Sequence, residues 1–318
     1  MSTLSIMIPV SSGSEDLPAL PFLKNVDYVK EQFETMLSIG DWPSAQRNRA
    51  ARMAKGDILY FLNRDSKVER DTFKKIVSII NSDEKIAGVG GPDLTPIDNS
   101  YMQHLFGYAM GSSFAHWKMR ARYLQVDRER VSDEKELVFS NLAIRRDVYL
   151  KINGLNENLY PNEENELINR ISKMGYQFIY SPEVKIYRDR RKTIAGFFKQ
   201  FHRYGKGRMK QILIEGVHGD LHFFLPIFLL GYFLFLPFMR GNWLVLIPLF
   251  IYVAFALIDA AYISFKNKKL LVLELPLIYI IMHISYGAGM LIGLFKISSP
   301  KKRRREASDC KVIEIQKT

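Results

Sequence analysis

The chain has 318 residues, 47% of them hydrophobic and 25% charged, which is enough for one sizeable α/β domain and a smaller second part. Its formal net charge of +12 points to a negatively charged partner, either nucleic acid or anionic lipid. The single cysteine, Cys310, excludes an intramolecular disulfide and suits a reducing compartment.

The part of the chain before residue 190 alternates strand-like and helix-like segments, which is the pattern of an α/β domain. The expected strands cover residues 5–10, 34–39, 57–62, 86–89, 137–141 and 176–180. The expected helices cover residues 16–32, 43–55, 70–81 and 162–174. Asp41 is expected to cap the helix that begins at Pro43.

The last third of the chain is strongly apolar. Runs at 221–239, 243–265 and 270–295 each approach or exceed the ~20 residues that a helix needs to cross a bilayer. Much of the excess positive charge lies next to these runs, including the basic run 301–305, so anionic lipid is the favoured partner and nucleic acid is not. If the α/β domain lies inside the cell, three full crossings would place the basic run outside, against the positive-inside tendency. Two crossings are therefore expected, and the third apolar segment could be broken, re-entrant or interfacial.

The tripeptide Asn63-Arg64-Asp65 directly follows a hydrophobic strand. Ligands of open α/β sheets bind outside the carboxyl ends of the strands, where a carboxylate can hold a divalent cation on a diphosphate. A solvated turn is the competing interpretation, and an acidic tripeptide alone does not separate the two.

Glu163 and Glu164 open the helix expected from residue 162. Acidic residues favour a helix N-terminus for electrostatic reasons, and the same carboxylates could act as a general base on an acceptor hydroxyl. Further along, Phe197, Phe198, Phe201 and Tyr204 would form one apolar helix face with lysines and arginines beside it, which is typical of a helix in the membrane interface. An arginine of that helix could also bind phosphate.

In this order, the elements resemble glycosyltransferase family 2, which has the GT-A fold, and especially its membrane-attached members of the succinoglycan type. The resemblance covers nearly the whole chain. The matching elements are residues 5–10, 46–48, 63–65, 139–146, 154–157, 163–164, 200–204 and 283–289. The sequence departs from the family pattern at several places: Asn63 replaces the first acid of DxD, Glu164 replaces an aspartate, Tyr204 replaces a tryptophan, and Asn153-Gly154-Leu155 replaces Gly-Gly-Phe. At the end of the second strand, Ile39 stands about where the family has an acid, and Asp41 is the nearest candidate.

The resemblance implies a role for each matching residue. Glu164, with Glu163 beside it, is the expected catalytic base, and Asp65 is the expected ligand of Mg²⁺ or Mn²⁺. The implied donor-binding residues are Pro9, Asp41, Arg47, Asn48, Asn63, Arg64, Gln200 and Arg203. The implied acceptor-side residues are Asn141, Arg145 and Gly154.

Four segments are expected: a GT-A catalytic domain at 1–192, an amphipathic interface helix at 193–218, a transmembrane region of two or three helices at 219–296, and a disordered polybasic tail at 297–318. The implied activity is inverting transfer of a sugar from a nucleotide donor, expected to be a UDP sugar, to a membrane-associated, polyprenyl-linked acceptor. The implied location is the inner membrane, with the catalytic domain facing the cytoplasm.

Three alternatives remain open at this point. The enzyme could be a processive polysaccharide synthase, or it could transfer sugar onto a polyprenyl phosphate. In the third, motivated by Asn63, the chain is a non-catalytic membrane scaffold with a decayed site.

Overall fold

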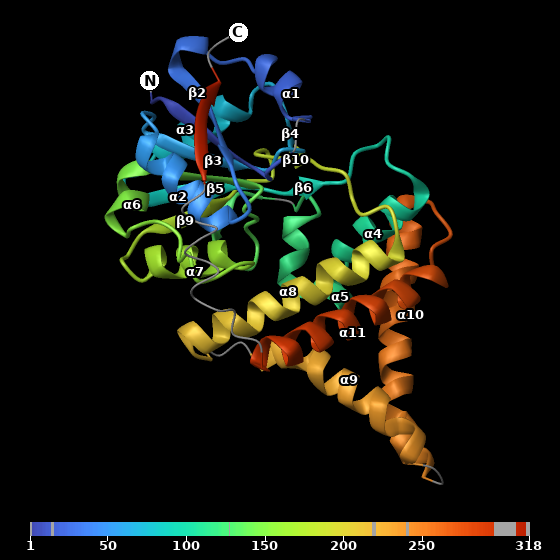
Figure 1. Ribbon diagram of the computed structural model, residues 1–318. Helices are drawn as coiled ribbons and strands as arrows, with labels where there is room; N and C mark the ends of the chain where they lie inside the picture. Colours follow the sequence, from blue (N-terminus) through green and yellow to red (C-terminus); the bar gives the residue numbers. More distant parts are fainter. Residues whose placement is uncertain are drawn as a thin grey trace. The chain divides into compact units, whose positions relative to one another are not determined.

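The computed structural model describes residues 2–13, 16–126, 128–217, 221–239, 242–295 and 310–315 (Figure 1). Its strands are β1 (Leu4–Val10), β2 (Phe33–Ile39), β3 (Ile58–Leu62), β4 (Lys67–Val68), β5 (Ile86–Gly90), β6 (Asp93–Leu94), β7 (Arg130–Ser132), β8 (Asn141–Arg145), β9 (Gln177–Tyr180), β10 (Ile186–Tyr187) and β11 (Lys311–Ile315). Its α-helices are α1 (Leu20–Lys24), α2 (Pro43–Met53), α3 (Thr72–Asn81), α4 (Tyr101–Met110), α5 (Ser113–His116), α6 (Arg146–Lys151), α7 (Glu163–Ser172), α8 (Ile194–Glu215), α9 (Leu225–Phe235), α10 (Ile247–Asn267) and α11 (Glu274–Phe295).

The chain divides into two compact units. The first, called the sheet unit, contains Met1–Pro96, Ala121–Asp189 and Ser298–Thr318. The second, called the helical unit, contains Ile97–Arg120 and Arg190–Ile297. This division differs from the expected one, because the insertion 97–120 belongs with the hydrophobic helices and the end of the chain belongs with the sheet.

The sheet unit is built on an eight-stranded mixed sheet with the strand order β11-β2-β1-β3-β8-β5-β9-β7. Strands β1, β2 and β3 are parallel, and β8 runs antiparallel to both β3 and β5. The carboxyl ends of β1, β2 and β3 therefore meet at one edge of the sheet. A second sheet has the strand order β4-β10-β6.

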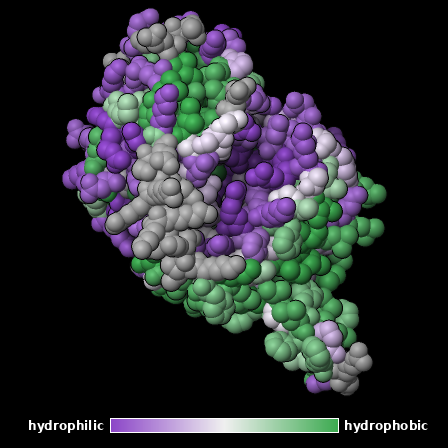
Figure 2. All heavy atoms as spheres, viewed as in Figure 1, coloured by the Kyte–Doolittle hydropathy of each residue, from purple (hydrophilic) through white to green (hydrophobic). Residues whose placement is uncertain are grey.

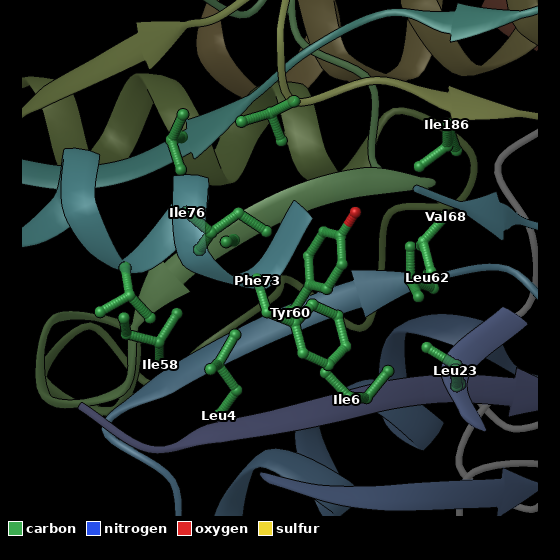
Figure 3. Packing of buried hydrophobic residues seen from close by; sticks show 14 of the residues in the cluster. Leu4, Ile6, Leu23, Ile58, Tyr60, Leu62, Val68, Phe73, Ile76 and Ile186 are labelled. Carbon is green, nitrogen blue, oxygen red and sulfur yellow. The ribbon is translucent and has the colours of Figure 1, made fainter. Parts of the chain in front are cut away.

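Apolar side chains fill both faces of the central strands, as expected for strands covered on two sides. Figure 3 shows Leu4 and Ile6 of β1 and Ile58 and Tyr60 of β3 packed beneath Phe73 of α3. Tyr60 and Phe73 meet edge to face with ring centroids 6.0 Å apart. These contacts fix β1 and β3 in place and thereby set where the loops that follow them begin.

Three local expectations are wrong. Residues 16–32 contain only the short helix α1 and a 3₁₀ turn, Lys30–Gln32, because Val29 before that turn is extended. The apolar run 137–140 is buried without being a strand, and β8 begins only at Asn141. Trp42, not Asp41, occupies the N-cap of α2, while Asp41 Oδ1 accepts a hydrogen bond from the backbone N–H of Ser12 at 3.3 Å.

The end of the chain also differs from the expected disordered tail. β11 pairs antiparallel with β2, with Lys311 opposite Ile39 and Ile315 opposite Thr35. Lys55 Nζ lies 3.1 Å from Glu314 Oε2. The basic run 301–305 lies outside the described residues.

In the helical unit, α8 packs along α11 through glycines (Figure 1). A Cβ added to Gly205 would lie 2.0 Å from the carbonyl oxygen of Tyr286, and one added to Gly289 would lie 2.0 Å from that of His202. The glycine-rich part of α11 is therefore what allows the two backbones to approach closely.

The apolar face expected for the interface helix is mainly covered by protein. Phe197 and Phe201 of α8 are each only 1% exposed, and Phe197 stacks on Phe106 of α4 with centroids 4.3 Å apart. Phe198 is 40% exposed. Helix α8 is thus a packed element of the helical unit with part of its surface open.

Among the residues that the structure describes, three helical segments are long and apolar enough to cross a membrane: Leu221–Phe238, Trp243–Asn267 and Glu274–Phe295. Figure 2 shows hydrophobic surface gathered over the projecting hairpin of α9 and α10. Phe228, Phe250 and Phe255 are among its large exposed side chains. The first two apolar runs are therefore helices whose side chains are largely uncovered by the other described residues, whereas α11 is more buried.

Candidate active site

The tripeptide 63–65 forms a tight turn at the carboxyl end of β3. The Ser66 N–H donates to the Asn63 carbonyl at 3.1 Å, and the Asn63 N–H donates to Ser66 Oγ at 3.1 Å. Ser66 Oγ in turn donates to the Ser140 carbonyl at 3.3 Å. Asp65 occupies the third position of this β-turn, so its backbone is fixed at the carboxyl end of β3, and the residue is half-buried.

Arg47 of α2 joins this turn to the acidic pair of α7. Its Nη1 lies 2.9 Å from Glu163 Oε1, and both side chains are nearly fully buried. Its Nη2 donates to Asn63 Oδ1 at 3.3 Å, and its guanidinium carbon lies 4.3 Å above the Phe139 ring. One planar guanidinium therefore gathers three of the sequence elements that were expected to form a site.

The two glutamates at the start of α7 differ in their surroundings. Glu163 is 2% exposed and is paired with Arg47. Glu164 is half-buried and, within the described ranges, its carboxylate makes neither a hydrogen bond nor an ion pair. Glu163 therefore holds the site together, and Glu164 is the carboxylate with capacity for an external partner.

Asn48, expected to bind the donor, is instead fully used inside the protein. Its Nδ2 donates to the Leu155 carbonyl and to Glu157 Oε1, each at 2.9 Å. Its Oδ1 accepts from the Leu155 N–H at 2.8 Å and from the Tyr149 hydroxyl at 2.7 Å. Burial raises the pKa of Tyr149, which keeps this hydroxyl a neutral donor. An amide has two donors and two acceptor positions, so none remains for a ligand.

Gly154, expected on the acceptor side, serves the same loop. Its φ is +66°, and a Cβ there would lie 2.4 Å from Asn48 Oδ1. Its carbonyl accepts from Arg170 Nη2 at 2.7 Å. Gly154 is therefore needed for the backbone to pass Asn48, which is a structural role.

Asn141 and Arg145, expected on the acceptor side, are also structural. Asn141 is 0% exposed, accepts from the Tyr60 hydroxyl at 2.7 Å and donates to the Val184 carbonyl at 2.6 Å. Arg145 pairs with Ile58 at the amino end of β3, which is the sheet edge opposite Asn63. Its Nε donates to the Ile86 carbonyl at 2.8 Å, and its Nη2 donates to the carbonyl oxygens at the end of α3.

The remaining donor-site candidates of the sheet unit lie at or just after the carboxyl ends of β1, β2 and β3. Pro9 is partly exposed near the end of β1, opposite Ser38 of β2. Asp41 is exposed after β2. Arg64 Nη1 donates to the Asp16 carbonyl at 3.2 Å, so its side chain is directed to the loop before α1.

Gln200 and Arg203 belong to the helical unit. Gln200 is 8% exposed, accepts from Arg191 Nε at 3.1 Å and donates to the Tyr204 hydroxyl at 3.0 Å. Arg203 is exposed. Gln200 thus orders the helix start around Arg191 and Tyr204, and Arg203 is the cation of this motif that faces outward.

Comparison with known proteins identifies the chain. The family model described as glycosyl transferase family group 2 matches residues 58–265, which is well over half of the chain. The chain belongs to this family. It is a glycosyltransferase with a mixed α/β fold of the GT-A type.

One solved structure with low sequence identity shares the transferase's fold, and a second is reported for comparison only. The mannosyltransferase PcManGT from Pyrobaculum calidifontis, solved in complex with GDP-Man and Mn2+, is 14% identical with a TM-score of 0.56, covering 94% of this chain and 88% of that one. TarS 1–349 of S. aureus in complex with UDP-GlcNAc is 12% identical with a TM-score of 0.47, covering 91% of each chain. The search of curated proteins gave no match.

Two buried polar pairs near the transferase's site were missed by the sequence analysis. Arg122 Nη2 donates to Asn165 Oδ1 at 2.7 Å, which ties the segment before β7 to the first turn of α7. Asp93, just after β5, lies 2.9 Å from Arg188 Nη2 and accepts from Ser140 Oγ at 3.2 Å. The rule that sites follow strand ends would have found Asp93; nothing in the sequence pattern pairs Arg122 with Asn165.

Proposed function

We propose that the transferase moves a hexose from a nucleoside diphosphate sugar to an acceptor hydroxyl with inversion at the anomeric carbon. The observation that supports this most directly is the Arg47 guanidinium, which contacts Asn63 at the expected donor end and Glu163 at the expected acceptor end. The two predicted halves of the reaction centre therefore lie within reach of one side chain.

In this proposal Glu164 is the general base. Its half-buried carboxylate can accept a proton from the acceptor hydroxyl as the oxygen attacks the anomeric carbon, while the nucleoside diphosphate leaves from the opposite face. The adjacent Glu163 is the positioning residue, because its pair with Arg47 fixes the first turn of α7. No covalent intermediate is needed, so rate acceleration comes from orientation and electrostatics.

Asp65 is the proposed ligand of a divalent cation. Among the described residues no group of three or more His, Cys, Asp or Glu side chains could hold a metal. One accessible carboxylate in a fixed turn fits a cation that takes its remaining ligands from the donor diphosphate and water. When bound, Mn²⁺ or Mg²⁺ neutralises charge on the departing diphosphate.

The remaining motif residues have proposed roles of a supporting kind. Arg203, exposed on α8, is the proposed contact to diphosphate, with Gln200 ordering the helix start beside it. Pro9, Asp41 and Arg64 are the proposed walls of the nucleotide pocket. Asn48 supports the acceptor loop from inside the protein.

The acceptor is proposed to be a polyprenyl-linked sugar in the inner membrane, reached from the cytoplasm. The support is the uncovered apolar surface of α9 and α10, which suits a lipid environment. A substrate confined to the bilayer surface encounters an enzyme that is anchored there more often than it encounters one in solution. The same geometry suits the alternative in which the sugar is transferred to a polyprenyl phosphate.

The experiment is a donor screen with the full chain purified in detergent, because detergent keeps the apolar helices covered. UDP and GDP sugars are supplied with Mn²⁺, with and without polyprenyl-diphosphate-linked acceptor, and released nucleotide is measured. Acceptor-dependent release from one donor supports the proposal. Absence of release and of nucleotide binding by calorimetry for every donor contradicts it and favours a non-catalytic scaffold. Product length separates single transfer from processive synthesis.

A further inference from the structure

The pairing of β11 with β2 carries information about membrane topology. Residues 311–315 pair in register with residues 35–39, and Cys310 beside them is only 4% exposed. Strands of one sheet must lie in one compartment. The end of the described chain therefore lies on the same side of any membrane as the sheet unit.

The connection between α11 and β11 cannot cross a bilayer. It runs from Phe295 to Cys310 and contains the five consecutive basic residues 301–305. A lysine or arginine at the centre of a membrane helix is energetically costly, so five in sequence exclude a crossing. The C-terminal end of α11 consequently lies on the side of the sheet unit.

The entry into the apolar region begins on the same side. The chain leaves the sheet unit at Asp189 and continues into α8. This helix carries Lys199, Arg203, Lys206, Arg208 and Lys210, and it is not among the segments apolar enough to span. Both ends of the region 221–295 therefore lie on one side, and the number of crossings within it is even.

The packing of α11 decides which segments cross. In α11, 44% of the residues of the apolar window are buried, compared with 6% in Leu221–Phe238 and 11% in Trp243–Asn267. Gly289 packs against the backbone of His202, and a Cβ on Gly293 would lie 2.8 Å from the Lys206 carbonyl. A helix in backbone contact with the cationic helix α8 shares its depth, so α11 lies at the surface of the membrane.

The hairpin of α9 and α10 has the dimensions of a double crossing. Its spans of 18 and 25 residues correspond to about 27 and about 37 Å at about 1.5 Å per residue, against a hydrocarbon thickness of about 30 Å. The Tyr232 hydroxyl donates to the Val245 carbonyl at 2.7 Å and ties the two arms near their connection.

We infer that the chain crosses the membrane twice, through α9 and α10, and that α11 remains on the side of the sheet unit, packed on α8. This inference rests on the membrane attachment of the proposed function. It removes the conflict that three crossings create with the positive-inside tendency. Lys266, Lys268, Lys269 and the basic run 301–305 then share one side, and Arg240 is the only cation between the two crossings.

The test is labelling of single cysteines by a membrane-impermeant maleimide, with the full chain in sealed vesicles of known orientation. The background is Cys310→Ser, which removes the native cysteine so that each variant carries one thiol. The exposed positions are Lys151→Cys in the sheet unit, Asn242→Cys between α9 and α10, Lys269→Cys between α10 and α11, and Lys311→Cys in β11.

Labelling of positions 151, 269 and 311 from one face, and of position 242 only from the other, is the expected result. Labelling of Lys311→Cys from the face opposite Lys151→Cys overturns the inference. So does labelling of Asn242→Cys from the same face as Lys151→Cys, or from neither face before detergent exposes it. The readout needs no sugar transfer, so a chain without activity still gives the topology, and an active chain with the wrong labelling refutes the topology alone.

Discussion

Arg47 and Glu163, 116 positions apart in the chain, form a buried ion pair with Nη1 and Oε1 2.9 Å apart. The pair connects α2 with α7, and the second nitrogen of the same guanidinium reaches Asn63 at the end of β3. It therefore couples the stability of the sheet unit to the geometry of the proposed site.

Breaking this pair on one side is expected to destabilise the protein. Arg47→Met leaves Glu163 as an uncompensated buried charge, which costs about 3–5 kcal/mol, and thermal unfolding in detergent measures the loss. Adding Glu163→Gln removes the stranded charge and is expected to recover much of the stability without recovering activity. Lys74→Met, which breaks the exposed pair with Asp27, is the control and should leave the melting temperature nearly unchanged, because solvent screens exposed ion pairs. An equal loss of stability in Arg47→Met and Lys74→Met would contradict this interpretation.

Glu164→Gln is expected to lower kcat by about 10²–10⁴ while leaving thermal unfolding and nucleotide binding unchanged, because it removes only a general base. Glu163→Gln is expected to lower stability as well, since Arg47 loses its partner. Glu84→Gln, an exposed glutamate of the same unit, is the control. Near-normal kcat in Glu164→Gln would refute its role as base.

Asp65→Asn is expected to weaken Mn²⁺-dependent nucleotide binding by at least about tenfold, because the amide is a poorer ligand for a hard cation. Calorimetry with UDP and GDP in the presence and absence of Mn²⁺ measures this. Asp71→Asn, six positions further on and paired with Lys75, should bind nucleotide normally. A Mn²⁺ dependence that survives Asp65→Asn would show that the cation is held elsewhere.

Arg145→Met tests a residue whose expected role the structure changes. It donates to backbone carbonyls of residues 80, 83 and 86 at the sheet edge opposite Asn63. Its removal is expected to lower stability by about 1.5–3 kcal/mol, the range for a hydrogen bond to a charged group, with the acceptor KM unchanged in the folded fraction. A raised acceptor KM with normal stability would restore the acceptor-side role.

Gly289→Val is expected to separate α8 from α11, because even a Cβ at this position would lie 2.0 Å from the His202 carbonyl. The melting temperature in detergent should fall by several degrees, because overpacking lowers the free energy of unfolding by about 1–3 kcal/mol. The control is Gly231→Ala in α9, where an added Cβ meets nothing within 4 Å. Equal stability of the two variants would mean that the helices do not need this approach.

The thiol of Cys310 reports on β11. Burial raises the pKa of this thiol, so the folded protein favours the protonated form, and docking of β11 is expected to weaken as pH rises above the ordinary value of 9.0. Alkylation should therefore be slow at neutral pH and fast after denaturation. The exposed thiol of Lys311→Cys in the Cys310→Ser background should react quickly throughout. Fast alkylation of native Cys310 would show that β11 is not docked.

The sequence by itself determined the order of the helices and strands, because local residue patterns were enough to predict most of them. Hydrophobic strands ending in polar turns, the acidic start of α7 and the apolar runs after residue 220 are each readable over a few residues, and most predicted strands and helices lie where expected. The family was predicted from the order of these motifs and is confirmed by the match over residues 58–265.

Only the tertiary structure decided which motif residues are free to act. Asn48, Asn141 and Arg145 look like site residues in the sequence, but their donors and acceptors are used by backbone and side-chain groups far away in the chain. The pairing of Arg47 with Glu163, the packing of α8 on α11 and the return of β11 to β2 are contacts between segments far apart in the chain. Hydrogen bonds and close packing depend on distances in space, and no local pattern of residue types encodes which distant partner will satisfy a buried polar group.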